Sequence, residues 1–355
     1  MDEELVARAA LGALPGLSRA HARRLIGALG SARALLGASE ARLAAHVPRK
    51  LAALVARGAA AGERALALAS DSGIRALAPD SPGFPSALRE IPDPPLLVWL
   101  RGELPVGPAL AIVGSRRPSA RGLAAAHAFA AELSRAGVAI VSGLAYGIDT
   151  SAHEGALAGA GRTVAVLASG LDRVTPPGQS RLAERILARG GGWLSERGPG
   201  ADARPYHFPE RNRLISGLAR ASLIVEAREK SGSLWTARHA LEQGRDVLVV
   251  PGPIDTDLCR GSNRLLRDGA TPILDADDLR LAVLGPLAAH PRLAPAAGEL
   301  APAARAVLDH LADGPCDLDA LSSALGRTPA ELARVLLELE LDGKLRREGS
   351  RLARV

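Results

Sequence analysis

A group of residues suited to binding phosphate follows an apolar segment at 109–113. The chain continues there as Gly-Ser-Arg-Arg-Pro over 114–118. The hydroxyl of Ser115 can donate a hydrogen bond to a phosphate oxygen, and the guanidinium groups of Arg116 and Arg117 can pair with its charge. The proline and the serine after it are typical of a helix start, where backbone N–H groups also attract anions. The segment predicts a phosphate-binding turn whose glycine lets a ligand approach the backbone closely.

A second loop, Ser-Gly-Leu-Ala-Tyr-Gly-Ile-Asp at 142–149, follows the next apolar segment. Gly143 can again bring the backbone near a ligand, and Tyr146 offers a ring for stacking. Asp149 is a possible general acid or base, with His153 one helical turn later. The plainer interpretation is favoured, in which Asp149 caps a helix beginning at the next residue and His153 is a structural polar residue.

The most distinctive segment is 206–215, which begins Tyr-His-Phe-Pro-Glu-Arg-Asn-Arg. Two of the chain's eight aromatic residues stand there beside two arginines that flank an asparagine. Single-stranded nucleic acid is held by stacking of bases on aromatic rings and by pairing of phosphates with cations, and each stacked base contributes about 1–3 kcal/mol. The alternative, with the aromatic ring in the core and the arginines on a solvated helix face, is less favoured for so tight a cluster. The predicted contacts are Phe208, Arg211, Asn212 and Arg213, with Arg204 as the nearest cation upstream.

Two further loops carry anion-binding features. Ser231 and Gly232 follow a predicted strand end and open a predicted helix, which is an anion-binding turn, and Lys230 adds a positive charge directly before it. Asn263 belongs to a Gly-Ser-Asn segment in a later loop and is expected at the same rim. These four residues complete the predicted binding set.

The elements that must position these loops alternate between strand and helix. Continuous apolar segments indicate strands buried on both faces, as in a parallel sheet covered by helices. Ligands of such sheets bind beyond the carboxyl ends of the strands. The fold class is therefore α/β, a Rossmann-like, doubly wound, mostly parallel sheet within 71–285. The predicted strands are 96–100, 109–113, 138–141, 163–168, 223–225, 247–250 and 272–274.

Smaller domains are predicted on either side. Residues 1–70 consist of short helical patterns broken by Gly and Pro, which indicates a helix-hairpin-helix or SAM-like domain. A Pro- and Ala-rich linker at 286–298 leads to a winged-helix domain at 299–355, with helices expected at 301–312, 317–325 and 329–341. Thr328 and Glu331 predict a capping box at the start of the third helix.

Charge is concentrated in two segments. The chain carries a net charge of +6, with an excess of five cations in 1–70 and seven cations against three anions in 204–238. The segment 299–355 has eight cations against ten anions. This distribution suits a polyanionic partner for the first two segments and argues against DNA binding by the last.

Composition narrows the class of protein further. No apolar segment approaches the roughly 18 residues that a membrane span needs, and the acidic N-terminus is unlike a signal peptide. The two cysteines, Cys259 and Cys316, form no ligand pair, and the histidines show no metal-binding spacing. A cytoplasmic protein without metal or cofactor is expected.

These motifs together resemble the bacterial DNA-processing protein A family, also called DprA or Smf. The resemblance covers roughly 80–280 and includes the segments at 112–116, 142–149, 207–213 and 231–237 in the same order. It implies a protein that binds single-stranded DNA, protects incoming DNA in natural transformation and loads the RecA recombinase onto it. It also implies a homodimer formed through the Rossmann-like domain, and it assigns Arg116 to phosphate binding.

An enzyme is the competing class. Rossmann-like relatives that hydrolyse nucleoside monophosphates use a PGGxGTxxE loop whose glutamate carries the chemistry. The corresponding place here, 231–238, holds no glutamate. The prediction is that the chain has no catalytic activity.

Overall fold

The computed structural model describes residues 2–14, 16–285, 302–341, 344–348 and 351–354. The chain divides into two compact units, Met1–Ala289 and His290–Val355. The linker predicted at 286–298 lies outside the described residues.

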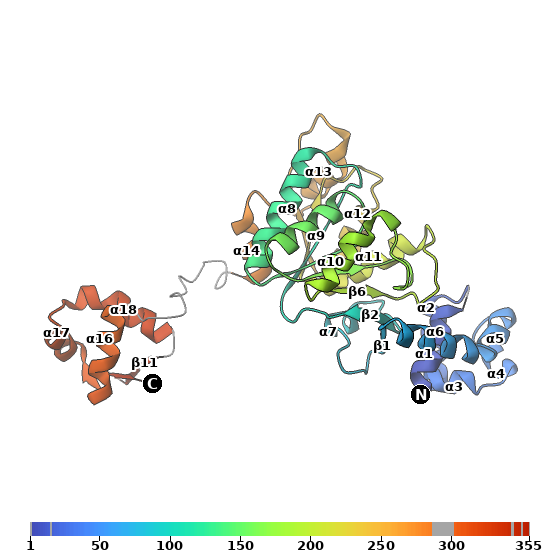
Figure 1. Cartoon of the computed structure of the whole chain (residues 1–355), viewed down its shortest axis with the longest axis horizontal. Coiled ribbons are helices and arrows are strands. Elements are labelled where there is room, and N and C mark those ends of the chain that lie inside the picture. Colours follow the sequence, from blue (N-terminus) through green and yellow to red (C-terminus); the bar gives the residue numbers. More distant parts are fainter. Residues whose placement is uncertain (1, 15, 286–301, 342–343, 349–350, 355) are drawn as a thin grey trace. The chain divides into compact units, whose positions relative to one another are not determined.

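Within the described part of the first unit, nine strands form one sheet in the order β1-β2-β6-β5-β4-β3-β7-β8-β9 (Figure 1). The strands from β6 through to β9 in this order are parallel, while β2 runs antiparallel to β6 and β1 antiparallel to β2. This confirms the predicted mostly parallel sheet. The strands are β1 (Arg75–Leu77), β2 (Val98–Gly102), β3 (Ala109–Gly114), β4 (Ala139–Ser142), β5 (Thr163–Val166), β6 (Gly192–Ser195), β7 (Ala221–Val225), β8 (Asp246–Val249) and β9 (Thr271–Pro272).

Two strands were not predicted. The unpredicted β6 is fully buried between β5 and β2. It was missed because a glycine run at 190–192 leaves only a short apolar segment before the polar loop. The edge strand β1 has three residues, too few to show a period.

Strand β3 shows why the central strands are apolar throughout. Leu110 and Ile112 pack into the core on one face of the sheet, and Ala111 and Val113 pack into the core on the other. Since successive side chains of a strand point to opposite faces, both faces must be covered. Helices α8 (Ala120–Arg135), α9 (Ile148–Ala158) and α14 (Ala276–Leu284) cover the first face, and α7 (Ser86–Arg89), α11 (His207–Leu218) and α12 (Ser233–Glu242) the second. The two other α-helices described between β1 and residue 285 are α10 (Ser180–Ala188) and α13 (Arg260–Arg267). Helix α10 packs on β5 and β6.

The strand order places the switch point of the sheet at β3. From β3 the chain proceeds through β4, β5 and β6 in one direction and then returns to place β7 on the other side of β3. The loops after β3 and β7 therefore leave the sheet in opposite directions and open a crevice between them.

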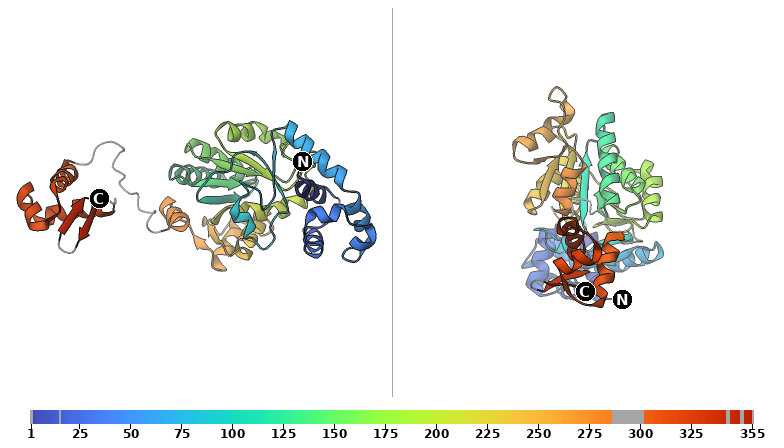
Figure 2. Two further views of the ribbon diagram at one scale, coloured as in Figure 1. Left: turned by 90° about the horizontal axis from the view of Figure 1, so that it is seen from below. Right: turned by 90° about the vertical axis from the view of Figure 1, so that its left-hand side faces the viewer.

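Short helices make up residues 3–71, as predicted. Their bounds are α1 (Glu3–Ala13), α2 (Arg19–Leu29), α3 (Ala32–Leu36), α4 (Glu40–Ala44), α5 (Arg49–Ala56) and α6 (Ala59–Asp71). They gather at one end of the first unit (Figures 1 and 2) and share an apolar core that includes Leu25, Leu35 and Leu43. Arg19 joins them to the sheet domain through its ion pair of 2.8 Å with Asp93.

The second unit has the winged-helix pattern. Its elements are α16 (Pro302–His310), β10 (Cys316–Asp317), α17 (Leu318–Leu325), α18 (Pro329–Leu341), β11 (Leu345–Glu348) and β12 (Arg351–Arg354). The predicted capping box is present, because the N–H of Glu331 donates to the Thr328 hydroxyl and the Glu331 carboxylate accepts from the N–H of Thr328. The three predicted helices are confirmed.

Candidate nucleic-acid interface

A cleft of about 800 Å³ opens at the switch point of the sheet. Its walls are the loops after β3 and β7 and the start of α11. Nine of the predicted residues line it, namely Ser115, Arg116, Arg117, Phe208, Arg211, Asn212, Lys230, Ser231 and Gly232. Segments more than a hundred residues apart in the chain are thus brought to one rim.

Arg116 and Phe208 meet inside this cleft. The guanidinium carbon of Arg116 lies 5.3 Å from the centre of the Phe208 ring, which is the geometry of a cation–π contact. Arg116 is exposed and Phe208 is half-buried. A cation and a ring face therefore stand side by side where a ligand can reach both.

Glycine is required at 114, at the end of β3, and at 147, before α9, because neighbouring backbone leaves no room for a Cβ. A Cβ at Gly114 would overlap the carbonyl oxygen of Val225 on β7. Gly147 has a φ of +83°, and a Cβ there would overlap the carbonyl oxygen of Ser115. The prediction that glycine at 114 serves close approach of a ligand is corrected, because neighbouring backbone occupies that space.

An anion already lies at the start of α8. Ser119 is the N-cap of this helix, and its N–H donates a 2.7 Å hydrogen bond to the carboxylate of Glu226, which also accepts from the Ser119 hydroxyl. Glu226 follows β7 with a φ of +50°. The helix start at which an anion was expected therefore already holds the carboxylate of Glu226, whereas phosphate binding by Ser115 and Arg116 stays a prediction. The sequence signal for Glu226 was only its place at a strand end.

Arg211 is buried beneath the cleft. Its Nη1 donates a 2.8 Å hydrogen bond to the carbonyl oxygen of Gly143 and a second bond to that of Val166. Burial lowers the pKa of Arg211 to about 10, opposed by the nearby carboxylate of Asp149. Its guanidinium is used to hold the loop after β4, which was not expected from the sequence.

The cap prediction for Asp149 is wrong in detail. Helix α9 begins at Ile148 with Gly147 as its N-cap, and the Asp149 carboxylate accepts from the N–H groups of Gly143 (3.1 Å) and Ala145 (3.3 Å). Burial raises the pKa of Asp149, while Arg211 and the two N–H groups act in the opposite direction. Asp149 thus organises the same loop that Arg211 holds.

His153 lies wholly inside the protein. Its Nδ1 is 2.7 Å from the hydroxyl of Thr163, and burial lowers the pKa of the imidazole to about 3. The ring is neutral at pH 7, in agreement with the structural interpretation.

The turn before α12 is tied to α11. The side-chain amide of Asn212 donates to the carbonyl oxygen of Gly232 at 3.0 Å, so Asn212 orients this loop. The hydroxyls of Ser231 and Ser233 are 2.8 Å apart, and Lys230 is exposed at the cleft. Arg228 also lines the cleft and is exposed. It was missed as a site residue, although the cation count of its segment pointed to it.

Five predicted residues do not line the cleft. Gly143 faces the guanidinium of Arg211, Tyr146 is exposed next to the cleft residue Ala145, and Arg204 is exposed next to Pro205. The side chain of Asn263 bonds the backbone of Gly252 in both directions. Arg213 is buried in ion pairs with Asp93 (3.1 Å) and Glu196. Its charge is therefore neutralised away from the cleft.

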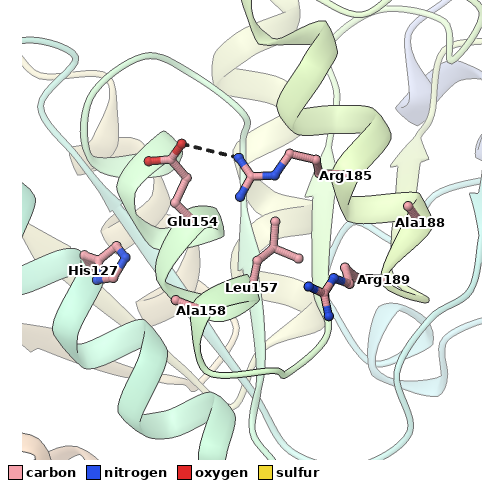
Figure 3. Close-up of a pocket in the computed structure, with 7 residues that line it drawn as sticks. All are labelled: His127, Glu154, Leu157, Ala158, Arg185, Ala188 and Arg189. Atoms are coloured by element: carbon pink, nitrogen blue, oxygen red, sulfur yellow. Dashed lines mark ion pairs between the residues drawn. The ribbon is translucent and has the colours of Figure 1, made fainter.

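A second depression, of about 450 Å³, lies between α8, α9 and α10 (Figure 3). Its floor includes Leu157, and Arg185 and Glu154 form an ion pair of 3.7 Å across it. None of the predicted site residues lines it. The convergence of cations and a ring is therefore a property of the cleft at the switch point.

Comparison with known proteins agrees with these features. Residues 75–283 match the family described as DNA recombination-mediator protein A, and residues 290–350 match the DprA winged helix domain. The chain belongs to the DNA recombination-mediator protein A family. The resemblance seen in the motifs, which covered roughly 80–280, is confirmed.

Relatives of this family include DNA processing protein DprA of Bacillus subtilis, 38% identical over 61% of this chain and 73% of that protein. Protein Smf of Escherichia coli is 37% identical over 74% of this chain and 73% of that protein. The X-ray structure of DprA from Streptococcus pneumoniae matches 80% of this chain and 98% of that one, with 30% identity and a TM-score of 0.67. A structure of DNA processing protein A from Helicobacter pylori, described for its single-stranded DNA binding mode, matches 58% of this chain and 93% of that one, with 30% identity and a TM-score of 0.52.

The described residues include neither a membrane-spanning helix nor a group of metal ligands. No helix among them is both long enough and apolar enough to cross a membrane. In the same part of the chain, no three His, Cys, Asp or Glu side chains come together as metal ligands would.

Proposed function

We propose that this chain binds single-stranded DNA in the cleft at the switch point of its sheet. The observation that carries the proposal is the contact between Arg116 and Phe208 in a cleft that also presents Arg117, Arg228 and Lys230. The four cations are exposed and can pair with phosphates, and the ring can stack on a base. The single-stranded DNA binding described for the Helicobacter pylori relative supports the same ligand.

A single strand suits the cleft better than a duplex. Phe208 is half-buried below the rim, so a base must leave its stack to reach the ring. In a duplex the base faces are covered by their neighbours, and unstacking them costs a few kcal/mol. An unpaired strand presents its bases without that cost.

The proposed role is that of a recombination mediator that protects incoming single-stranded DNA during natural transformation and loads RecA onto it. The family description of recombination mediation supports this role. Adding the protein to RecA and DNA already covered by a single-strand binding protein is expected to speed RecA filament formation. An unchanged rate would contradict the loading role while leaving DNA binding intact.

We further propose that the chain acts as a homodimer. Ile254 and Leu274, in the loops after β8 and β9, are 89% and 75% exposed, which supports a self-contact surface at that edge. Sedimentation of the purified chain is expected to give twice the monomer mass, and Ile254→Glu is expected to lower it.

No catalytic activity is proposed. Asp149 is the one residue lining the cleft that has a carboxylate, and it accepts hydrogen bonds from two loop N–H groups. Incubation with AMP and other nucleoside monophosphates is expected to release no base. Release of free base that is lost in Asp149→Asn would establish the enzymatic alternative.

The decisive experiment for binding is a gel-shift series with single- and double-stranded oligonucleotides of one sequence. We expect a strong preference for the single strand and a loss of affinity with added salt, because phosphate contacts are screened. Equal affinity for the duplex would contradict the proposal.

A further inference from the structure

Exposed aromatic rings are found only beside the cleft. The structure describes all eight aromatic residues of the chain, and the exposed ones are Tyr146 (51%), Tyr206 (55%) and Trp235 (45%). Tyr146 adjoins the cleft residue Ala145, and Tyr206 directly precedes α11. Trp235 lies in the first turn of α12, whose Ser233 and Thr236 line the cleft. Of the three, Trp235 has the largest ring and no role in the function proposed above.

Trp235 stands in a depression that shares one lining residue with the cleft. This depression, of about 350 Å³, is lined by Trp235, His239 and Arg213 among others. Pro209 lines both the depression and the cleft. A chain leaving the cleft over Pro209 therefore meets the ring of Trp235.

The ring lies beside a guanidinium group and an imidazole. The guanidinium carbon of Arg238 is 5.5 Å from the centre of the Trp235 ring, and the His239 ring centre is 6.5 Å away. Glu242 positions both neighbours, since its carboxylate accepts from Nε of Arg238 at 2.9 Å and lies 3.2 Å from Nδ1 of His239. A ring paired with a guanidinium is the combination that binds a base and its phosphate.

The carboxylates of the depression are neutralised by arginines. Asp93 pairs with Arg19, Arg23 and Arg213, and Glu210 pairs with Arg197 and Arg19. Glu242 pairs with Arg238. A phosphate passing over this surface is therefore not met by unpaired negative charge.

We infer that Trp235 and Arg238 form a second base-stacking subsite for single-stranded DNA that leaves the cleft past Pro209. The inference rests on the proposed function and adds a ligand contact outside the cleft. It requires an oligonucleotide long enough to reach from Phe208 to Trp235. A strand that fills only the cleft does not touch it.

The test uses the fluorescence of Trp235 in the full chain. Trp99 and Trp193 are buried, so a change in tryptophan emission on adding DNA reports on Trp235. Oligothymidylates of about 4 and about 15 nucleotides span the range of strand lengths that such sites hold. The longer one is expected to quench the emission and the shorter one to leave it unchanged.

Variants separate stacking from other effects. Trp235→Ala is expected to weaken binding of the longer strand about ten-fold, within the range known for one stacked base, and to leave the shorter strand unaffected. Trp235→Phe, which keeps a ring, is expected to recover part of the affinity. Leu241→Ala, at another exposed apolar position of α12, is the matched control and is expected to change neither.

The outcomes also distinguish this inference from the proposed function. If Arg116→Ala weakens binding of both strands while Trp235→Ala changes neither, the inference is wrong and the proposed function stands. If the wild-type chain binds neither strand, both fail. A change of Trp235 emission with protein concentration alone, and none with DNA, would place Trp235 in a protein interface and overturn the inference.

Discussion

Nη1 of Arg211 donates a 2.8 Å hydrogen bond to the carbonyl oxygen of Gly143, so a buried guanidinium on α11 holds the loop that follows β4. The carboxylate of Asp149 also holds this loop, because it accepts a hydrogen bond from the N–H of Gly143. The floor of the cleft thus contains two buried side chains of opposite charge that organise the loop. The cations offered to a ligand are the exposed ones at the rim.

Replacing Arg211 by alanine is expected to destabilise the fold. The change removes a donor from two carbonyl oxygens, and it removes the charge that most favours the ionised form of the buried Asp149. Loss of one partner of a buried charge pair costs about 3–5 kcal/mol. The free energy of unfolding, measured by urea titration with circular dichroism, is expected to fall by an amount of that order. Arg121→Ala, at an exposed position of α8, is the control and is expected to stay within about 0.5 kcal/mol of the parent. A variant of full stability that loses only DNA affinity would make Arg211 a direct contact.

Arg116 is exposed and Arg213 is buried, so we expect their replacement by alanine to have different effects. Arg116→Ala is expected to weaken single-stranded DNA binding about ten-fold without changing the melting temperature, because its side chain is exposed. The slope of log affinity against log salt should become shallower by about 0.7, the contribution of one phosphate contact to a single strand.

Arg213→Ala is expected to do the reverse. It removes the fully buried partner of Asp93 and Glu196, whose other arginine partners are partly exposed. The melting temperature should therefore fall while the salt slope stays the same. A shallower salt slope in this variant would show that Arg213 reaches phosphate after all.

His153 predicts a pH dependence of stability. Its pKa is lowered to about 3 in the folded chain, whereas an unfolded histidine titrates near 6.5. Below pH 6.5 the unfolded state takes up the proton first, so this residue makes stability fall as pH drops toward about 3, by at most about 1.4 kcal/mol per pH unit. His153→Gln is expected to flatten this part of the stability curve, measured by urea unfolding at several pH values. His127→Gln, at an exposed position, should leave it unchanged, and equal curves for both variants would contradict the assignment.

The second unit is expected to contribute little to DNA affinity. Residues 299–355 carry eight cations against ten anions, so phosphates gain no net attraction there. A chain ending at residue 289, the boundary of the first compact unit, should bind single-stranded DNA within about three-fold of the full chain in gel-shift titrations. A loss of a hundred-fold would show that the charge argument is wrong.

Local patterns in the sequence indicated most of the architecture, although they did not reveal β1 and β6. Continuous apolar segments predicted the parallel strands, and the residues after those strands predicted where a ligand binds, because parallel strands end at one edge of a sheet. The turn at Arg116 was identified this way, and the ring at Phe208 was identified from its cluster with arginines. The structure places the guanidinium carbon of Arg116 5.3 Å from the centre of the Phe208 ring. The capping box at Thr328 was likewise visible, since its two partners are three residues apart.

The use of each charged side chain was decided only by the tertiary structure. Arg211 and Arg213 are two residues apart on one helix, about 200° around its axis, so they face different surroundings. One meets the carbonyl of Gly143 and the other meets the carboxylates of Asp93 and Glu196. Those partners come from distant parts of the chain, and no local pattern indicates which arginine they neutralise. Burial and pairing depend on what the fold brings near, whereas local composition was enough to indicate most of the strands, the turns after them and the rim at which they meet.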